Sequence, residues 1–233
     1  MERRDFLNMC AAGAALSINP ARAANLRPRF YTRVRLVDEA RQPLRAATLA
    51  ASRNYIFHYP YVATPCFLLN LGKPTLPAVT LKTENGASYE WAGGVGAQNA
   101  IVGYSAICAH RLAYPTRQIS FISYRNAAGP ATITHNNVIH CCSEHSEYDP
   151  ATGARVLGGP APQPLSAIVL EHDPSNDSLY AVGTLGGEMF EAFFAKYAFK
   201  LALEYGDQRA REPVARETVV AELQKYCRQQ VQC

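Results

Sequence analysis

The sequence predicts an all-β domain followed by a helical tail. Short apolar segments separated by turns, such as Gly-Lys-Pro at 72–74 and Glu-Asn-Gly at 84–86, fill the middle of the chain. This pattern is typical of strands joined by tight turns. Near the end, apolar residues of 187–205 recur at spacings of three and four, which indicates a helix. We therefore expect strands up to about residue 185 and helices beyond it.

The composition is that of an ordinary globular protein. Of the 233 residues, 48% are hydrophobic and 18% are charged, and the net charge of +4 is spread along the chain. Because a nucleic-acid surface usually shows clustered Lys and Arg, we expect no nucleic-acid partner. The seven cysteines are too irregularly spaced for a disulfide scaffold. Cys227 and Cys233 are candidates for a disulfide, either with each other or with a partner protein. The alternative is that both lie in a frayed C-terminal tail.

The amino terminus has the pattern of an export signal. Arg3 and Arg4 precede a weakly apolar run that reaches about Ile18, and an Ala-x-Ala site ends at Ala23. We predict that residues 1–23 are a twin-arginine signal and that the protein is periplasmic. The alternative is the N-terminal helix of a cytosolic protein. The run is shorter than the ~20 residues that span a bilayer, so a membrane tether is expected only if the signal is uncleaved.

The remaining chain divides into three parts. Residues 24–54 form an N-terminal arm, residues 55–185 a β domain, and residues 186–233 a helical extension. The expected strands are 30–37, 67–71, 100–105, 119–124, 132–139, 167–170 and 179–182. The first expected helix, 187–205, ends before Gly206, and Pro213 is expected to open a second one that continues to Cys227.

Two short boxes combine sulfur and imidazole donors. They are Cys108-x-His110 and Cys142-x-x-His145. Their close spacing allows both donors of a box to leave one tight loop and reach one metal centre. A zinc site is an alternative, because two cysteines and two histidines also form a tetrahedral set. Zinc fingers usually pair cysteine with cysteine and histidine with histidine, so the mixed boxes favour two metal ions over one.

The residues around these boxes resemble the Rieske iron–sulfur family. Residues 148–153 (Tyr-Asp-Pro-Ala-Thr-Gly) and 158–165 (Gly-Gly-Pro-Ala-Pro-Gln-Pro-Leu) resemble the strand, turn and Pro loop that follow the cluster ligands. Residues 59–74 and 101–108 resemble the small Rieske subunit of arsenite oxidase. The resemblance covers about residues 55–185. It implies an antiparallel β-sandwich with a small cluster-binding subdomain.

The resemblance also implies the cofactor and its ligands. One [2Fe–2S] cluster per chain is expected, held by Cys108, His110, Cys142 and His145. In such a centre two histidines replace two cysteines on one iron. Cys141 is an alternative to Cys142 that the sequence leaves open, although the family pattern favours Cys142. His135 and His140 lie nearby but have neither the Cys-x-His nor the Cys-x-x-His offset.

Several positions depart from the family pattern. The disulfide that often joins the two cluster loops has Ala113 and Glu144 in place of its cysteines, and Glu147 replaces a serine that donates to a bridging sulfide. The segment 111–141 is longer than usual. Fewer donors to the sulfurs and more carboxylates nearby lower a reduction potential. We therefore expect a potential in the lower part of the Rieske range.

The function implied by the resemblance is one-electron transfer, with no catalytic residue or substrate site on this chain. The leading hypothesis is the small subunit of a periplasmic arsenite-oxidase-type oxidoreductase. Its partners would be a large molybdopterin subunit and a cytochrome c or copper protein. The alternatives are the Rieske subunit of a quinol–cytochrome c reductase-like complex and a structural zinc module.

Overall fold

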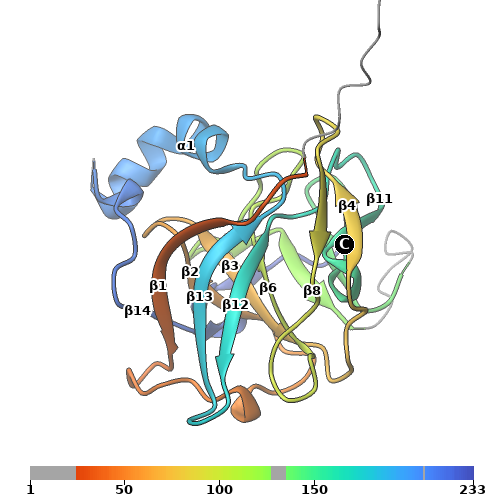
Figure 1. Ribbon diagram of the computed structural model, residues 1–233. Coiled ribbons are helices and arrows are strands. Elements are labelled where there is room, and N and C mark those ends of the chain that lie inside the picture. Colours follow the sequence, from red (N-terminus) through yellow and green to blue (C-terminus); the bar gives the residue numbers. More distant parts are fainter. Residues whose placement is uncertain (1–24, 127–134, 207) are drawn as a thin grey trace, which may run out of the picture.

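The computed structural model describes residues 25–126, 135–206 and 208–233, and strands dominate it (Figure 1). Its largest sheet has eight strands in the order β14-β1-β13-β12-β6-β3-β2-β15. Their bounds are β1 (Arg29–Val37), β2 (Tyr55–His58), β3 (Pro65–Asn70), β6 (Ile101–Ser105), β12 (Ala167–Asp173), β13 (Ser178–Leu185), β14 (Glu217–Val219) and β15 (Ala221–Glu222). Neighbouring strands are antiparallel, except β1 and β14. The all-β prediction is confirmed.

A second sheet of four strands, in the order β11-β10-β9-β8, lies beside the first. Its strands are β8 (Ile122–Arg125), β9 (Val138–Cys141), β10 (Ser146–Asp149) and β11 (Arg155–Gly158). Two small ribbons pair β4 (Val79–Lys82) with β5 (Ser88–Trp91) and β7 (Ile119–Ser120) with β16 (Gln229–Gln230). Short 3-10 helices occupy Ala46–Thr48, Pro150–Thr152 and Arg209–Arg211.

The core between the two sheets is apolar. Phe67 and Tyr104 of the large sheet join one buried cluster with Ile139, Cys141 and Tyr148 of the small sheet. The small sheet holds the second sequence box at the turn between β9 and β10. Packing of this sheet on the large one therefore fixes where that box lies.

Most predicted elements in the described residues are found. The strands predicted at 30–37, 67–71, 100–105, 167–170 and 179–182 correspond to β1, β3, β6, β12 and β13. The segment 119–124 forms β7 and β8, and the last residues of 132–139 lie in β9. The predicted signal, residues 1–23, and residues 132–134 lie outside the described residues. No helix in the described ranges has the length and apolar character needed to cross a membrane.

The C-terminal segment is less helical than predicted. The first predicted helix is present as α1 (Phe190–Tyr205), but the second is wrong. Instead, β14 and β15 follow, and the helix α2 spans only Leu223–Tyr226. Thr218 and Val220 are buried, whereas Val219 between them is 36% exposed. This alternation of period two is that of a strand with one buried face.

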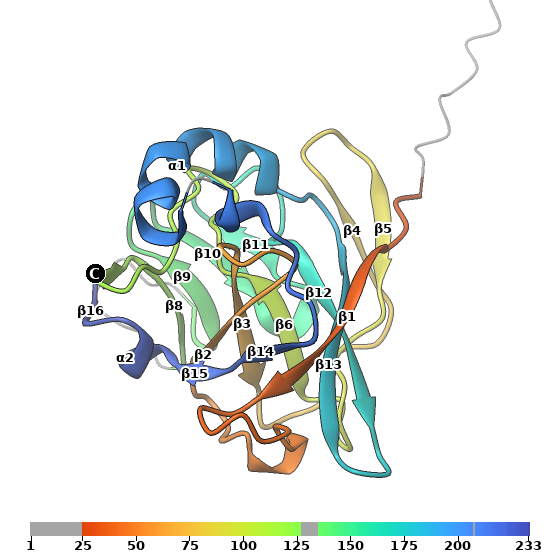
Figure 2. The same cartoon turned by 90° about the vertical axis from the view of Figure 1, so that its left-hand side faces the viewer.

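The strands β14 and β15 nearly close the large sheet (Figure 2). β14 pairs with β1 at one end of the sheet and β15 pairs with β2 at the other, with Val220 alone between them in the sequence. The chain then continues through α2 and β16 and ends beside the small sheet. A sheet edge that is paired in this way offers few unsatisfied backbone groups.

Helix α1 covers the first sequence box. Phe193 and Phe194 are buried in one cluster with Ile107, Leu112 and Tyr114. The aromatic side chains of this helix therefore pack on the β domain. Because Ile107 and Leu112 flank the box, burial of the helix also fixes the loop that contains Cys108.

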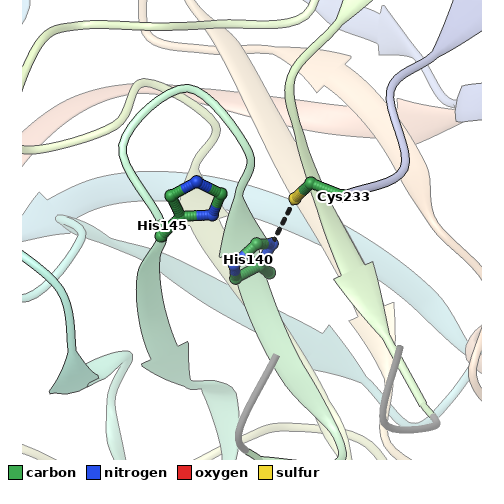
Figure 3. A group of neighbouring side chains, drawn as sticks. All are labelled: His140, His145 and Cys233. Carbon is green, nitrogen blue, oxygen red and sulfur yellow. Dashed lines mark hydrogen bonds between the residues drawn. The ribbon is translucent and has the colours of Figure 1, made fainter. Parts of the chain in front are cut away.

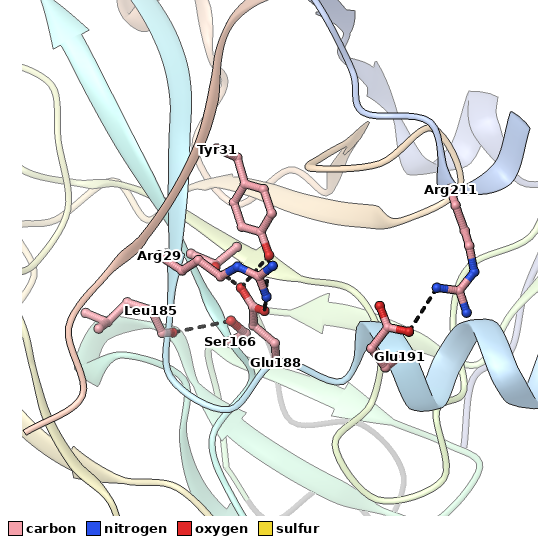
Figure 4. A network of polar contacts seen from close by, with 8 residues as sticks. Arg29, Tyr31, Ser166, Leu185, Glu188, Glu191 and Arg211 are labelled. Atoms are coloured by element: carbon pink, nitrogen blue, oxygen red, sulfur yellow. Dashed lines mark hydrogen bonds and ion pairs between the residues drawn. The ribbon is translucent and has the colours of Figure 1, made fainter. Parts of the chain in front are cut away.

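Polar contacts fix both sides of the start of α1 (Figure 4). Glu188 accepts hydrogen bonds from the Tyr31 hydroxyl at 3.0 Å and from Arg29 Nη1 at 3.0 Å. Glu191 in the first turn pairs with Arg211 at 2.9 Å. The negative charge of Glu191 in the first turn also suits the helix dipole.

The C-terminal segment packs on His58, and this makes the free energy of unfolding depend on pH. Its Nε2 lies 3.3 Å from the hydroxyl of Tyr226, and burial, with the nearby charge of Arg117, lowers its pKa to about 4. Between pH 6.5 and 4 the unfolded chain binds a proton at this site that the folded chain does not. Stability therefore falls as the pH falls through this window, by up to about 3 kcal/mol.

We expect His58→Gln to reduce this loss, because glutamine does not titrate. Urea unfolding of both proteins between pH 7 and 4 measures the effect. An unchanged slope of unfolding free energy against pH in His58→Gln would exclude this residue as the source.

Candidate metal centre

The first box lies in a tight loop after β6. Strand β6 ends at Ser105, and Cys108 follows with its side chain fully buried. The backbone N–H of Leu112 donates to the carbonyl oxygen of Cys108 at 3.0 Å, and Leu112 has a φ of 62°. The loop therefore reverses direction four residues after the cysteine. Strand β6 holds the beginning of this loop, and helix α1 packs against it.

The second box lies in a turn of the same form after β9. The backbone N–H of His145 donates to the carbonyl oxygen of Cys141 at 2.7 Å, and His145 has a φ of 57°. Gly159 of the predicted Pro loop packs against this turn, because a Cβ on Gly159 would lie 2.5 Å from Ser146 Cα. The start of the predicted Pro loop, directly after β11, thus lies against the second box.

The structure places the two adjacent cysteines on opposite faces of the small sheet. Side chains alternate along a strand, so Cys141 points into the core that contains Cys108, whereas Cys142 points away from it. Cys142 instead forms a disulfide with Cys233, with a Cα–Cα distance of 5.7 Å. Of the alternatives for the C-terminal cysteines, a bond between Cys227 and Cys233 is not formed, since Cys227 is a buried free thiol.

The structure therefore does not bring Cys142 to Cys108, and this corrects the expectation that Cys142 is the second sulfur donor. The thiols of Cys108 and Cys141 are hydrogen-bonded to each other instead. The alternative left open by the sequence, Cys141, is the one that the geometry favours. The sequence alone did not show which face of β9 meets the first loop.

Hydrogen-bond donors surround the sulfur of Cys108. The Cys141 thiol, and then the Tyr148 hydroxyl 3.3 Å away, lower the pKa of Cys108 to about 6 against the opposing effect of burial. The backbone N–H groups of His110 and Arg111 donate to the same sulfur. The hydrogen bond to Cys108 and burial raise the pKa of Cys141. The site thus stabilises negative charge on sulfur in a buried place.

The two predicted histidines are in different surroundings. His110 is half-buried, and its Nδ1 is buried with no hydrogen-bond partner among the described residues. His145 is exposed, and its ring centroid is 5.8 Å from that of His140. Donor atoms of His140, His145 and Cys233 lie within 4.8 Å of one another (Figure 3). His145 therefore lies near the face of β9 that carries the disulfide between Cys142 and Cys233.

Sequence reasoning missed two participants. The first is Tyr148. Ser146 of β10 pairs with Cys141 of β9, and Tyr148 follows Ser146 by two residues. Because side chains alternate along a strand, Cys141, Ser146 and Tyr148 lie on one face of the small sheet. This signal was present in the sequence, but it needed the register of the two strands. Cys233 had no such signal, because its approach to Cys142 depends on the path of the last 20 residues.

Comparison with known proteins gives a likeness to a solved structure. No family model matches the chain. Among solved structures, the soluble domain of the Rieske protein II (soxF) from Sulfolobus acidocaldarius is 24% identical, with 66% of this chain and 78% of that chain covered and a TM-score of 0.45.

Proposed function

We propose that this chain transfers single electrons through a Rieske-type [2Fe–2S] cluster. Cys108 and Cys141 would bind one iron, and His110 would bind the other. The fourth ligand would come from the turn 142–145, for which the sequence predicts His145. The contact between the thiols of Cys108 and Cys141 is the observation that supports this proposal most directly.

The donor set fits such a cluster. Two cysteines that share one iron must bring their sulfurs together, and Cys108 and Cys141 do so from separate loops. The backbone N–H groups of His110 and Arg111 point at one sulfur, and those of Ser143 and Glu144 point at the other. The unpartnered Nδ1 of His110 is a further donor atom at the same loop. When bound, the cluster supplies a reversible one-electron couple.

The chain's own residues would then exclude water and tune the potential. Cys108, Cys141 and Tyr148 are all fully buried, so the sulfurs lie in a medium that solvates charge poorly. Hydrogen bonds to sulfur stabilise the more negative, reduced state. Helix α1 and the loop at Gly159 fix the two loops from outside.

Anaerobic reconstitution with iron and sulfide tests the proposal. We expect about two irons and two sulfides per chain, and an EPR signal after reduction by one electron. A reconstituted protein that stays colourless and binds no iron would exclude the cluster.

Tyr148→Phe is expected to lower the reduction potential by some tens of millivolts. The variant removes the hydroxyl that lies 3.3 Å from Cys108 Sγ, and a hydrogen bond to a charged acceptor contributes about 1.5–3 kcal/mol, of which a part differs between the two redox states. Protein-film voltammetry measures the shift. Tyr124→Phe is the control, since that hydroxyl contacts Asn137. An equal shift in both variants would assign it to a general change in packing.

For the biological role, we propose the small subunit of an exported, arsenite-oxidase-type molybdenum oxidoreductase in the periplasm. The residues at 59–74 and 101–108 and the signal-like residues 1–23 support this assignment. Electrons would pass between a large molybdopterin subunit and a cytochrome c or copper protein. Affinity purification of the native complex with molybdenum analysis tests it. Co-purification with a cytochrome b would favour a quinol–cytochrome c reductase-like complex instead.

A structural zinc site is the second candidate. The grouping of His140, His145 and Cys233 within 4.8 Å favours it, because imidazole and thiolate are preferred ligands of zinc. In the structure the sulfur of Cys233 is held in a disulfide, which is not a thiolate. Purified protein with one zinc and no iron per chain would support this candidate over the cluster.

A further inference from the structure

The two loops of the candidate centre share one backbone plan. In each, the cysteine sulfur accepts from the N–H groups two and three residues later, His110 and Arg111 for Cys108, and Ser143 and Glu144 for Cys141. In each, the N–H four residues after the cysteine donates to the cysteine carbonyl, and that fourth residue has a positive φ. The two loops can therefore be compared position by position.

This comparison assigns His145 to the same position as Leu112. Leu112 packs under α1 with Phe193 and does not belong to the buried cluster that contains the thiols. His145 is likewise displaced from the thiols, because it is exposed and its ring faces His140 and Cys233. The turn position that carries His145 thus directs its side chain away from the pair of cysteines.

Glu144 is the ligand-type side chain of the second loop that faces the first loop. Its carboxylate lies 3.3 Å from Nε of Arg111, the residue that follows His110, and 28% of its side chain is exposed. The ion pair links the two loops beside the histidine that has an unpartnered Nδ1. A carboxylate oxygen is a competent ligand for iron, as in sites that combine histidine with one carboxylate.

We propose that Glu144, and not His145, is the fourth protein ligand of the cluster, which rests on the proposed [2Fe–2S] function. One iron is then bound by Cys108 and Cys141, and the other by His110 and the Glu144 carboxylate. A carboxylate brings one more negative charge than a neutral imidazole. The potential is therefore lower than that of a centre with two histidines.

Counting the nitrogens bound to the reduced cluster by pulsed EPR tests the assignment. We expect one strongly coupled histidine nitrogen in the wild type and two in Glu144→His, with a higher reduction potential in the variant. Glu144→Ala is expected to lose most of its iron. His145→Ala is expected to keep the wild-type iron content, nitrogen count and potential.

Arg111→Ala separates ligation from loop stabilisation. It removes the ion pair but leaves the carboxylate, so we expect it to keep the cluster that Glu144→Ala loses. Equal loss in both variants would reduce Glu144 to a loop contact and overturn the proposal. Two nitrogens in the wild type, with one lost in His145→Ala, would also overturn it while leaving the cluster itself established. A wild type without iron and sulfide would instead overturn the proposed function.

Discussion

Replacing either Cys108 or Cys141 by serine is expected to abolish stable cluster incorporation, whereas Cys142→Ala/Cys233→Ala is expected to retain it. The first two thiols meet in the buried core, and serine cannot supply the thiolate that the iron requires. Cys142 points to the other face of β9, where it is bonded to Cys233. Iron and sulfide per folded chain, with the visible spectrum, measure the outcome.

Cys227→Ala is the matched control, because Cys227 is also a buried free cysteine but lies in the C-terminal segment. We expect it to bind as much iron as the wild type. Retention of iron in Cys141→Ser together with its loss in the double variant would restore Cys142 as the ligand. Circular dichroism of each variant distinguishes loss of ligation from loss of fold.

Removing the disulfide is expected to lower the free energy of unfolding by about 2–5 kcal/mol. Cys142 and Cys233 are 91 residues apart, and a bond that closes so long a loop restricts the unfolded chain strongly. In the folded state it holds the end of the chain on the small sheet, where Arg125 also donates to the carbonyl oxygen of Val231 at 2.6 Å. Urea unfolding of Cys142→Ala/Cys233→Ala against the wild type measures the difference.

Reduction provides an independent control for this prediction. Dithiothreitol is expected to destabilise the wild type by the same amount and to leave the double variant unchanged. An effect of the reductant on the double variant would point to another cause, because the remaining cysteines in the described residues are free thiols. A stability unchanged by either treatment would contradict the role assigned to the bond.

These two experiments concern opposite faces of one strand. Cys141 faces the core and would hold the cofactor, whereas Cys142 faces the C-terminal segment and holds the fold. The disulfide therefore fixes β9 from the side away from the thiol pair. A stable β9 in turn keeps Cys141 in the buried cluster that contains Cys108.

The sequence by itself determined the strands β1, β3, β6, β12 and β13, the helix α1 and the first box. Their signals are local: alternation in β1, spacings of three and four in Phe190–Tyr205, and a Cys-x-His directly after the apolar strand β6. The C-terminal segment after Pro213 had no such clear signal. Its apolar residues fit a helix and a strand equally. The segment forms the strands β14 and β15 because it pairs with β1 and β2.

Only the tertiary structure decided which donors converge. The choice between Cys141 and Cys142 depends on which face of β9 packs on the large sheet, and one residue of register exchanges the two faces. The pairing of Cys142 with Cys233 depends on the chain closing the large sheet before it returns to the small one. A short motif gives the residue types and their spacing, whereas the direction of each side chain comes from long-range packing.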